Sequence, residues 1–364
     1  MKLSIPDYIA SIAPYKPGKP LDELARETGI THAIKLASNE NPIGPSPAAV
    51  TAIQHALTDL HRYPDGSGHA LVVKLANKLG IDPGQIVLGN GSDDIIGILS
   101  RALIRPGDEV IVPSPSFLMY DIMVRSCGGV SVVVPLRDRA ICIDDIQAAV
   151  TPRCKMIFLC NPNNPTGSIV SKTHFEKLLA SLPRDILVVV DEAYMEFVRD
   201  PACARSLAYD PEKYQIVTLR TFSKAYGLAG LRIGYGVMSK DLADILHRVR
   251  QPFNTNSLAQ VAAIAALDDD LFLQQTIDMV HEGLDYFYAE LTRAGIGYFP
   301  TQANFMLIDV GQSADAVFEK LLHKGVIVRS MRAYSYPEYI RVNVGQPREN
   351  QRFIQSLESV MSRS

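Results

Sequence analysis

The stretch IVTLRTFSKAYGLAGLRIGYG, residues 216–236, says most about the fold and chemistry of this chain. Its β-branched start, Ile216–Leu219, is typical of a strand, and a turn with Ser223 and Lys224 follows. The glycines after this turn let the backbone crowd a ligand, and Arg232 adds a permanent cation. An amine beside a guanidinium that can bind phosphate predicts a Schiff-base site for a phosphorylated aldehyde cofactor. That cofactor would be pyridoxal 5′-phosphate. Since a single loop lysine is usually a solvated surface charge, this prediction needs other support.

The segment LVVVDEAY, residues 187–194, gives the first such support. Its uninterrupted apolar run is typical of a parallel strand that is buried on both faces. Because α/β sheets bind ligands beyond the carboxyl ends of such strands, we expect Asp191 at a ligand site. A carboxylate there can keep the pyridine nitrogen of the cofactor protonated, and Tyr194 can offer its hydroxyl to the ring oxygen. A helix N-cap is the competing interpretation of Asp191.

Two more strand-to-loop junctions point to the same edge. The strand-like run MIFLC (156–160) leads into the rigid loop NPNNPTG, in which Asn164 is the expected second donor to the ring oxygen. The segment QIVLGNGSDDII (85–96) predicts a strand, a turn and the start of a helix, whose free N–H groups can bind phosphate. The candidates for this cradle are Gly91, Ser92 and Asp93. The spacing lacks the third glycine of a dinucleotide fingerprint, which disfavours nicotinamide.

Strand-like and helix-like runs alternate through the first two thirds of the chain, which predicts an α/β doubly wound sheet. The expected strands are Ile86–Leu88, Val110–Val112, Val130–Val134, Met156–Cys160, Leu187–Val190 and Ile216–Leu219, and helices are expected at His174–Ser181 and Leu242–Val249. One long helical stretch from Ser257 to about Ala294 contains no proline and could bridge two domains. A smaller α+β region follows, with strands near Asn304–Ile308 and Ile340–Val344 and a helix at Ala314–His323.

In this order, the segments resemble the fold type I pyridoxal-phosphate aminotransferases, and among them the histidinol-phosphate aminotransferase family. The matching motifs are KLASNENPIGPS (35–46), HRYPD (61–65), NPNNPTG (161–167), DEAY (191–194), the run around Lys224, and YIRVNVG (339–345). The resemblance implies a large domain with a mostly parallel doubly wound sheet and a smaller α+β domain. It also implies an N-terminal arm (1–40) that joins the small domain, a cofactor-binding domain (41–260), and a small C-terminal domain with a linking helix (261–364).

The resemblance also implies roles for individual residues. Lys224 would form the Schiff base and move a proton between the substrate Cα and the cofactor C4′. Asp191, Asn164 and Tyr194 would hold the ring, and Phe117 would stack on it, in a position where some members have tyrosine. The phosphate would be held by Ser92, Asp93, Ser223 and Arg232. Tyr63 matches a position that reaches the phosphate in the neighbouring subunit, so the resemblance implies a homodimer with shared active sites.

Two arginines near the end of the chain suggest where the substrate binds. Arg329 and Arg341 interrupt apolar strand-like runs, and a guanidinium suits a carboxylate or phosphate. A structural salt bridge is the alternative for either one. By the family's pattern, Arg341 would bind the α-carboxylate of glutamate or the phosphate end of the other substrate. Arg329 and Tyr15 would bind the distal anion, and Asn39 would join this substrate-binding set.

The leading functional hypothesis is transamination between L-histidinol phosphate and 2-oxoglutarate, giving imidazole acetol phosphate and glutamate. An aromatic-amino-acid aminotransferase is the main alternative, since Arg341 suits any amino-acid carboxylate. A threonine-phosphate decarboxylase shares the cofactor frame, but the motifs near Asn39 and Tyr63 favour the aminotransferase. A non-enzymatic regulator would need an added DNA-binding module, for which the roughly thirty residues before the recognisable frame leave no room.

Length, charge and cysteine content limit the possible partners, metal sites and cellular location of the protein. A chain of 364 residues can bury a large core, and its net charge of −3 argues against nucleic acid as a partner. Five cysteines without metal-ligand spacing or a disulfide framework indicate a reducing compartment, and no metal site is expected. No signal-like start and no apolar run of about 18 residues occur, so we expect a cytoplasmic protein without membrane association.

Overall fold

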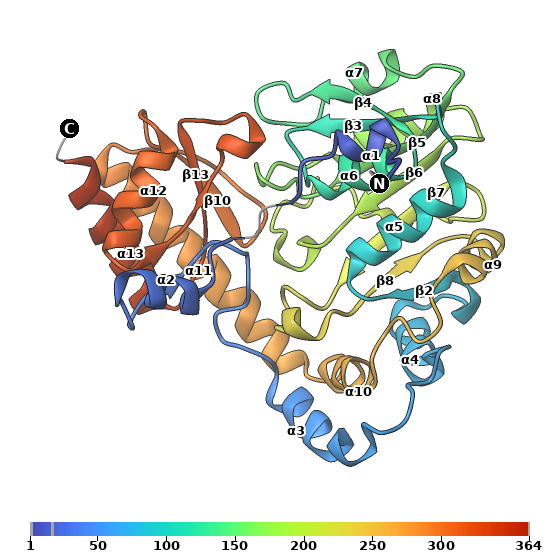
Figure 1. The fold of residues 1–364 in the computed structure, drawn as a ribbon, viewed down its shortest axis with the longest axis horizontal. Coiled ribbons are helices and arrows are strands. Elements are labelled where there is room, and N and C mark those ends of the chain that lie inside the picture. Colours follow the sequence, from blue (N-terminus) through green and yellow to red (C-terminus); the bar gives the residue numbers. More distant parts are fainter. Residues whose placement is uncertain (1–2, 16–17, 363–364) are drawn as a thin grey trace.

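The computed structural model describes residues 3–15 and 18–362 of the chain. Within them, the two main sheets lie in two parts of the molecule, and a long helix, α11 (Asp270–Ala294), runs from the smaller part toward α10 of the larger one, as Figure 1 shows. The larger sheet has seven strands in the described residues, and the smaller has four, in the order β12-β13-β10-β9. This is the α/β architecture, with a smaller α+β part, that the sequence predicts.

The larger sheet is mostly parallel. Its strand order is β2-β8-β7-β6-β5-β3-β4, and only β8 runs antiparallel to its two neighbours. The strands are β2 (Ile86–Gly89), β3 (Glu109–Ser114), β4 (Val130–Pro135), β5 (Cys154–Cys160), β6 (Leu187–Asp191), β7 (Ile216–Thr221) and β8 (Gly234–Val237). Since β5, β6 and β7 are adjacent and parallel, the segments that follow them meet at one edge of the sheet.

Helices cover both faces of this sheet. On one face, Val189 and Val217 pack against Tyr120 and Leu246. The helices of this face are α5 (Ser92–Leu103), α6 (Met119–Ser126) and α9 (Lys240–Val249). The helices of the other face are α3 (Pro47–Ala56), α4 (His69–Leu79), α7 (Ile143–Ala148), α8 (Lys172–Ser181) and α10 (Ser257–Ala266). Because the central strands are apolar on both faces, helices must cover both, which gives the doubly wound arrangement.

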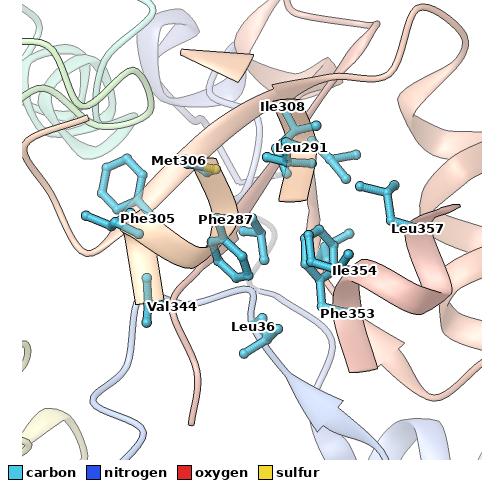
Figure 2. Packing of buried hydrophobic residues seen from close by; sticks show 14 of the residues in the cluster. Leu36, Phe287, Leu291, Phe305, Met306, Ile308, Val344, Phe353, Ile354 and Leu357 are labelled. Carbon is cyan, nitrogen blue, oxygen red and sulfur yellow. The ribbon is translucent and has the colours of Figure 1, made fainter. Parts of the chain in front are cut away.

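The smaller sheet is antiparallel and packs on three helices. Its strands are β9 (Gly297–Phe299), β10 (Phe305–Asp309), β12 (Arg329–Ser330) and β13 (Tyr339–Asn343), and α12 (Ala314–His323) and α13 (Pro347–Met361) join α11 against it. Figure 2 shows the core between them, where Phe287 of α11 and Phe353 of α13 meet with ring centroids 5.5 Å apart. This core fixes β13, the strand that carries Arg341.

The N-terminal segment touches both parts of the molecule. Helix α1 (Asp7–Ala10) lies near α6, and Arg125 Nη2 donates to Ser11 O at 2.9 Å. Further along, α2 (Leu21–Thr28) packs through Leu24 on the smaller part, and β1 (Ile34–Lys35) pairs with β11 (Val326–Ile327). The segment therefore passes from one part to the other beside the edge where β5, β6 and β7 end.

Two local expectations were wrong or incomplete. The single helix expected from Ser257 to Ala294 is two helices, α10 and α11, because Asp269 caps the second one by accepting from Phe272 N at 3.1 Å. A stretch without proline is therefore not necessarily one continuous helix, because an aspartate within it can cap the start of a second helix. Strand β8 was not predicted, since its sequence GYGV contains two glycines and strands rarely do.

Candidate active site

A cavity of about 410 Å³ opens at the carboxyl edge of the larger sheet. Its walls come from the ends of β5, β6 and β7, from the N-terminal segment, and from β12 and β13 of the smaller sheet. The predicted site residues that line it are Tyr15, Asn39, Ser92, Asp93, Phe117, Asn164, Asp191, Tyr194, Ser223, Lys224, Arg232, Arg329 and Arg341. Two predicted residues, Gly91 and Tyr63, are not among the lining residues.

Lys224 follows β7 and extends its amine into this cavity. The Nζ atom donates to the carbonyl oxygen of Ser38 at 3.1 Å. Burial, aided by the nearby Arg341 guanidinium, lowers the pKa of Lys224 to about 8. An appreciable share of this amine is therefore neutral near physiological pH, as a nucleophile or general base requires.

Asp191 ends β6 and is held by two donors. Its Oδ2 accepts from the Tyr120 hydroxyl at 2.8 Å, and its Oδ1 accepts from Ala193 N at 3.1 Å. Burial raises the pKa of Asp191 to about 6, while the Tyr120 hydrogen bond opposes this shift. The next helical element is a short 3₁₀ turn that begins at Met195, so Asp191 does not cap an α-helix.

Tyr194 and Asn164 form a hydrogen-bonded pair beside the lysine. The Tyr194 oxygen accepts from Asn39 Nδ2 at 3.0 Å and from Asn164 Nδ2 at 3.4 Å, which leaves its own proton available to a ligand. Burial raises the pKa of Tyr194, so the hydroxyl stays protonated. Asn164 Oδ1 in turn accepts from Arg341 Nη1 at 2.5 Å.

The start of α5 and Arg232 form a pocket suited to an anion. Helix α5 begins at Ser92, and a Cβ on Gly234 would lie 2.5 Å from Ser92 N, so the strand approaches the helix end too closely for a side chain. Arg232 Nη2 donates to Asp93 Oδ1 at 2.8 Å, and Arg232 Nη1 lies 3.5 Å from Ser223 Oγ as a donor. Free helix N–H groups, a hydroxyl and a guanidinium together match a phosphate group.

The wall from the smaller sheet carries the two predicted substrate arginines. Arg341 is buried, its Nη2 donates to Ala37 O at 2.8 Å, and its Nε has no partner among the described residues. Arg329 lies on β12 and pairs in register with Arg341 on β13. Tyr15 and Asn39 approach from the N-terminal segment, so both substrate arginines line the same cavity as Lys224.

Tyr63 lies apart from the cavity lining of its own chain. Its side chain is 82% exposed and stacks on Phe253, with ring centroids 4.8 Å apart. Phe253 is itself 45% exposed and has a left-handed backbone with φ of 57°. Two large exposed rings in contact form an apolar surface feature that solvent does not favour.

Sequence reasoning missed several residues of the site. Tyr120 donates to Asp191, and its place soon after Phe117 in the sequence could have drawn attention to it. Tyr334 lines the cavity from a 3₁₀ turn between β12 and β13, and no local motif marks it. Ser38 offers only its backbone carbonyl to Lys224, which sequence patterns do not show.

Comparison with known proteins gives the family. A family model described as aminotransferase class I and II matches residues 31–357. The chain belongs to this family. It is 47% identical to a histidinol-phosphate aminotransferase of Desulfotalea psychrophila, with 98% of this chain and 95% of the relative covered. A histidinol-phosphate aminotransferase of Moorella thermoacetica is 44% identical, with 97% and 92% covered.

Solved structures agree with this assignment. The histidinol-phosphate aminotransferase of Sinorhizobium meliloti, solved in complex with pyridoxal 5′-phosphate, superimposes with a TM-score of 0.89 at 28% identity, over 98% of this chain and 97% of that one. An aspartate aminotransferase of Thermotoga maritima gives a TM-score of 0.86 at 22% identity, which shows the shared fold alone. This chain therefore has the type I fold and is a pyridoxal-phosphate-dependent aminotransferase.

The residues of the cavity fit this cofactor. It needs an amine of lowered pKa, a carboxylate facing a ring nitrogen and a cradle for a phosphate, which Lys224, Asp191 and the Arg232 pocket can supply. Within residues 3–15 and 18–362, no group of histidine, cysteine or acidic side chains could hold a metal ion. In the same residues, no helix is long and apolar enough to cross a membrane.

Proposed function

We propose that this enzyme transfers the amino group of L-histidinol phosphate to 2-oxoglutarate, giving imidazole acetol phosphate and glutamate in histidine biosynthesis. Relatives named histidinol-phosphate aminotransferase, at 42–47% identity, support this reaction over the aromatic-amino-acid alternative. The observation that carries the proposal is a cavity with cationic groups at two separate places. Arg232 lies near the start of α5, and Arg329 and Arg341 lie on the opposing sheet. One phosphate belongs to the cofactor, which leaves the second place for an anionic substrate.

The start of α5 and the loop after β7 supply the residues that would hold the cofactor phosphate. They are Ser92, Asp93, Ser223 and Arg232. Gly91 lies just before them, and a Cβ there would lie 2.5 Å from Arg232 Nη2. Glycine at this position therefore lets the guanidinium lie against the helix start, where the free N–H groups point.

The ends of β5 and β6 supply the residues that would hold the cofactor ring. Asp191 would face the ring nitrogen, Asn164 and Tyr194 the ring oxygen, and Phe117 the ring face. Asp191 supplies a buried negative charge, which stabilises a protonated ring nitrogen. When bound, the cofactor supplies an electron sink for the electrons of the substrate Cα–H bond.

Lys224 is the proposed general base. With its pKa lowered to about 8, its amine can accept a proton from the substrate Cα and release it again at moderate cost. Tyr194 keeps its proton because burial raises its pKa, so it can donate to an oxygen in the cavity.

The N-terminal segment and the smaller sheet would bind the substrates. Arg341 is proposed to bind the α-carboxylate of glutamate, because its Nε is buried and lacks a partner in the described part of the chain. Arg329 and Tyr15 are proposed to bind the distal phosphate of histidinol phosphate, and Asn39 is proposed to line the path between them. Both arginines would be desolvated around an anion, which strengthens charge-assisted hydrogen bonds.

We also propose a cytoplasmic homodimer with shared active sites. Exposed apolar side chains on and near α3 support an interface there, namely Ile43, Val50, Leu57, Leu60, Tyr63 and Phe253. Such a group is more apolar than solvent-facing surfaces usually are. In a two-fold dimer, Tyr63 would reach the cofactor phosphate of the partner subunit.

Steady-state kinetics of the purified enzyme test the proposed substrate. With 2-oxoglutarate as acceptor, kcat/KM for L-histidinol phosphate should exceed that for phenylalanine or tyrosine by about tenfold or more, the value of one charge-assisted contact. Rescue of a histidine auxotroph that lacks this step is the matching genetic test. A higher kcat/KM for phenylalanine would instead support the aromatic aminotransferase.

A further inference from the structure

Residues 36–39 lie between the smaller sheet and two side chains of the site. The carbonyl oxygen of Ser38 accepts from Lys224 Nζ at 3.1 Å. The Asn39 Nδ2 group donates to the Tyr194 oxygen at 3.0 Å. A shift of this short segment would therefore disturb both the lysine amine and the tyrosine hydroxyl.

Two asparagines hold this segment, one at the end of β13 and one just before β10. Asn343 Oδ1 accepts from Asn39 N at 3.0 Å, and Asn304 Nδ2 donates to Asn39 O at 3.1 Å. All three asparagines are buried. Asn39 has a left-handed backbone with φ of 55°, so both of its backbone groups are held in a conformation that costs energy.

The orientation of the Asn343 amide follows from its contacts. Its Nδ2 donates to Val344 O at 3.1 Å, so its Oδ1 must face the Asn39 N–H group. Asn343 lies two residues after Arg341 on β13, and both side chains therefore lie on the same face of the strand. Arg341 Nη2 donates to Ala37 O, which gives the segment one more contact from this face.

This arrangement leaves hydrogen-bonding capacity unused. Within the described residues, Asn39 Oδ1 and Asn304 Oδ1 are buried and have no partner. Each unsatisfied buried group destabilises the fold, because it loses its hydrogen bonds to water and gains none in return. Apolar side chains at these buried positions would give a more stable core. The asparagines are therefore better explained by the position in which they hold residues 36–39.

We propose that Asn304 and Asn343 are positioning residues, which hold residues 36–39 so that Ser38 O meets the Lys224 amine and Asn39 meets the Tyr194 hydroxyl. The proposal rests on the proposed roles of Lys224 and Tyr194. It gives the smaller sheet an influence on the chemistry that does not require Asn304 or Asn343 to touch substrate or cofactor.

The test compares Asn343→Leu and Asn304→Leu with the control Asn350→Leu. Asn350 is a buried asparagine of the same part of the molecule, and its side-chain amide bonds to the backbone of Gly345. In cofactor-free protein, the rate at which acetic anhydride modifies Lys224 is measured against pH by mass spectrometry. Loss of the Ser38 acceptor destabilises the ammonium, so the midpoint should move to lower pH in the first two variants and stay in place in the control.

Kinetics of the cofactor-loaded enzyme give the second measurement. In the first two variants kcat should fall about tenfold because proton transfer is disturbed, and in the control it should stay within about threefold of wild type. If Asn343→Leu does not fold, Asn304→Ala carries the same test. An unchanged Lys224 midpoint, or an equal shift in Asn350→Leu, would overturn the proposal. Failure of wild-type Lys224 to form a borohydride-stable adduct with the cofactor would instead reject its proposed catalytic role, independently of the midpoints.

Discussion

The two walls of the cavity differ in how they are built. The wall from the larger sheet places Asp191 at the end of β6 and Lys224 shortly after β7, and these two strands are adjacent and parallel. The opposing wall combines Tyr15 from the N-terminal segment with Arg329 and Arg341 from paired strands, so residues from opposite ends of the chain meet there. The residues of the first wall are thus placed by the ends of neighbouring strands. Those of the second wall come together only when distant segments of the chain pack against each other.

This difference suggests that the first wall serves the chemical step and the second wall serves substrate recognition. The pKa values of Asp191 and Lys224 are both moved towards neutrality by burial, as acid–base and electrostatic catalysis require. The arginines of the opposing wall are permanent cations, which suit recognition of an anion more than proton transfer. We therefore expect changes in the first wall to affect turnover and changes in the second to affect substrate choice.

The largest effect is expected for Lys224→Ala. Removal of both the amine nucleophile and the general base should lower kcat by about 10⁴-fold or more, since a general base alone contributes up to about that factor. Borohydride reduction of the wild-type enzyme, followed by peptide mapping, should place the cofactor label on Lys224. A label on a different lysine would contradict this assignment.

The second largest effect is expected for Asp191→Asn, because a neutral amide cannot stabilise a protonated ring nitrogen. We expect kcat to fall about 10²- to 10³-fold, the usual loss when one preorganised electrostatic group is removed. The variant should still bind the cofactor, which absorbance and equilibrium dialysis can measure. Tyr120→Phe keeps the Asp191 carboxylate but removes the hydrogen bond to its Oδ2, so it is the matched milder variant. Near-normal turnover in Asp191→Asn would leave Asp191 with a structural role.

The sequence predicted the first wall better than the second. Ile216–Leu219 and Leu187–Val190 form strands as expected, and the side chains after them reach the cavity, because position along a parallel strand determines which edge a residue occupies. The start of α5 at Ser92 was likewise indicated by a local turn sequence. These features depend on short segments, which patterns of a few residues describe well.

The missed features depend on contacts between distant segments. Tyr334 reaches the cavity from an irregular turn, and Asn304 and Asn343 contact Asn39 only after two strands and the N-terminal segment assemble. No periodicity marks such a contact. The break before α11 was missed for a different reason, since Asp269 is a local capping signal that was present in the sequence.

Arg329→Ala and Arg341→Ala test the second wall. Arg329→Ala should lower kcat/KM for histidinol phosphate by about ten- to a hundredfold, the value of one charge-assisted contact, and change that for phenylalanine little. Arg341→Ala should lower kcat/KM for glutamate as well, because the α-carboxylate loses its partner. Steady-state kinetics with three amino donors make the comparison. Equal losses on phenylalanine and histidinol phosphate in Arg329→Ala would reject its phosphate role.

Tyr63 tests whether a third wall comes from a partner subunit. Mixing Lys224→Ala chains with Tyr63→Ala chains should restore roughly a quarter of wild-type activity, because about half of the dimers are hybrids and each has one intact site. Subunit exchange is checked by native mass spectrometry, and each parent homodimer must be clearly impaired. Absence of recovery after demonstrated exchange would place Tyr63 in the site of its own chain.

The smallest expected effect concerns stability. Burial raises the pKa of Asp191 from 3.8 to about 6, so the folded protein binds a proton there more tightly than the unfolded chain does. Ionised Asp191 therefore destabilises the cofactor-free fold, with a cost that grows as the pH rises from the unfolded pKa to the folded one and then stays constant. Asp191→Asn removes this cost but disturbs one of two hydrogen bonds, so we expect a gain of about 1–2 kcal/mol at neutral pH.

Urea unfolding of the cofactor-free protein at about pH 4 and about pH 7.5 measures this gain, which should be smaller at the lower pH. Asp144→Asn is the control, in which the change in stability should have the opposite sign. Lys177 lowers the pKa of the exposed Asp144 carboxyl, so this variant should lose stability relative to wild type as the pH rises. A variant that gains stability while losing turnover would show that Asp191 is retained for chemistry at the expense of the fold. Equal stability of Asp191→Asn and wild type at both pH values would mean that the buried carboxylate is already compensated without the cofactor.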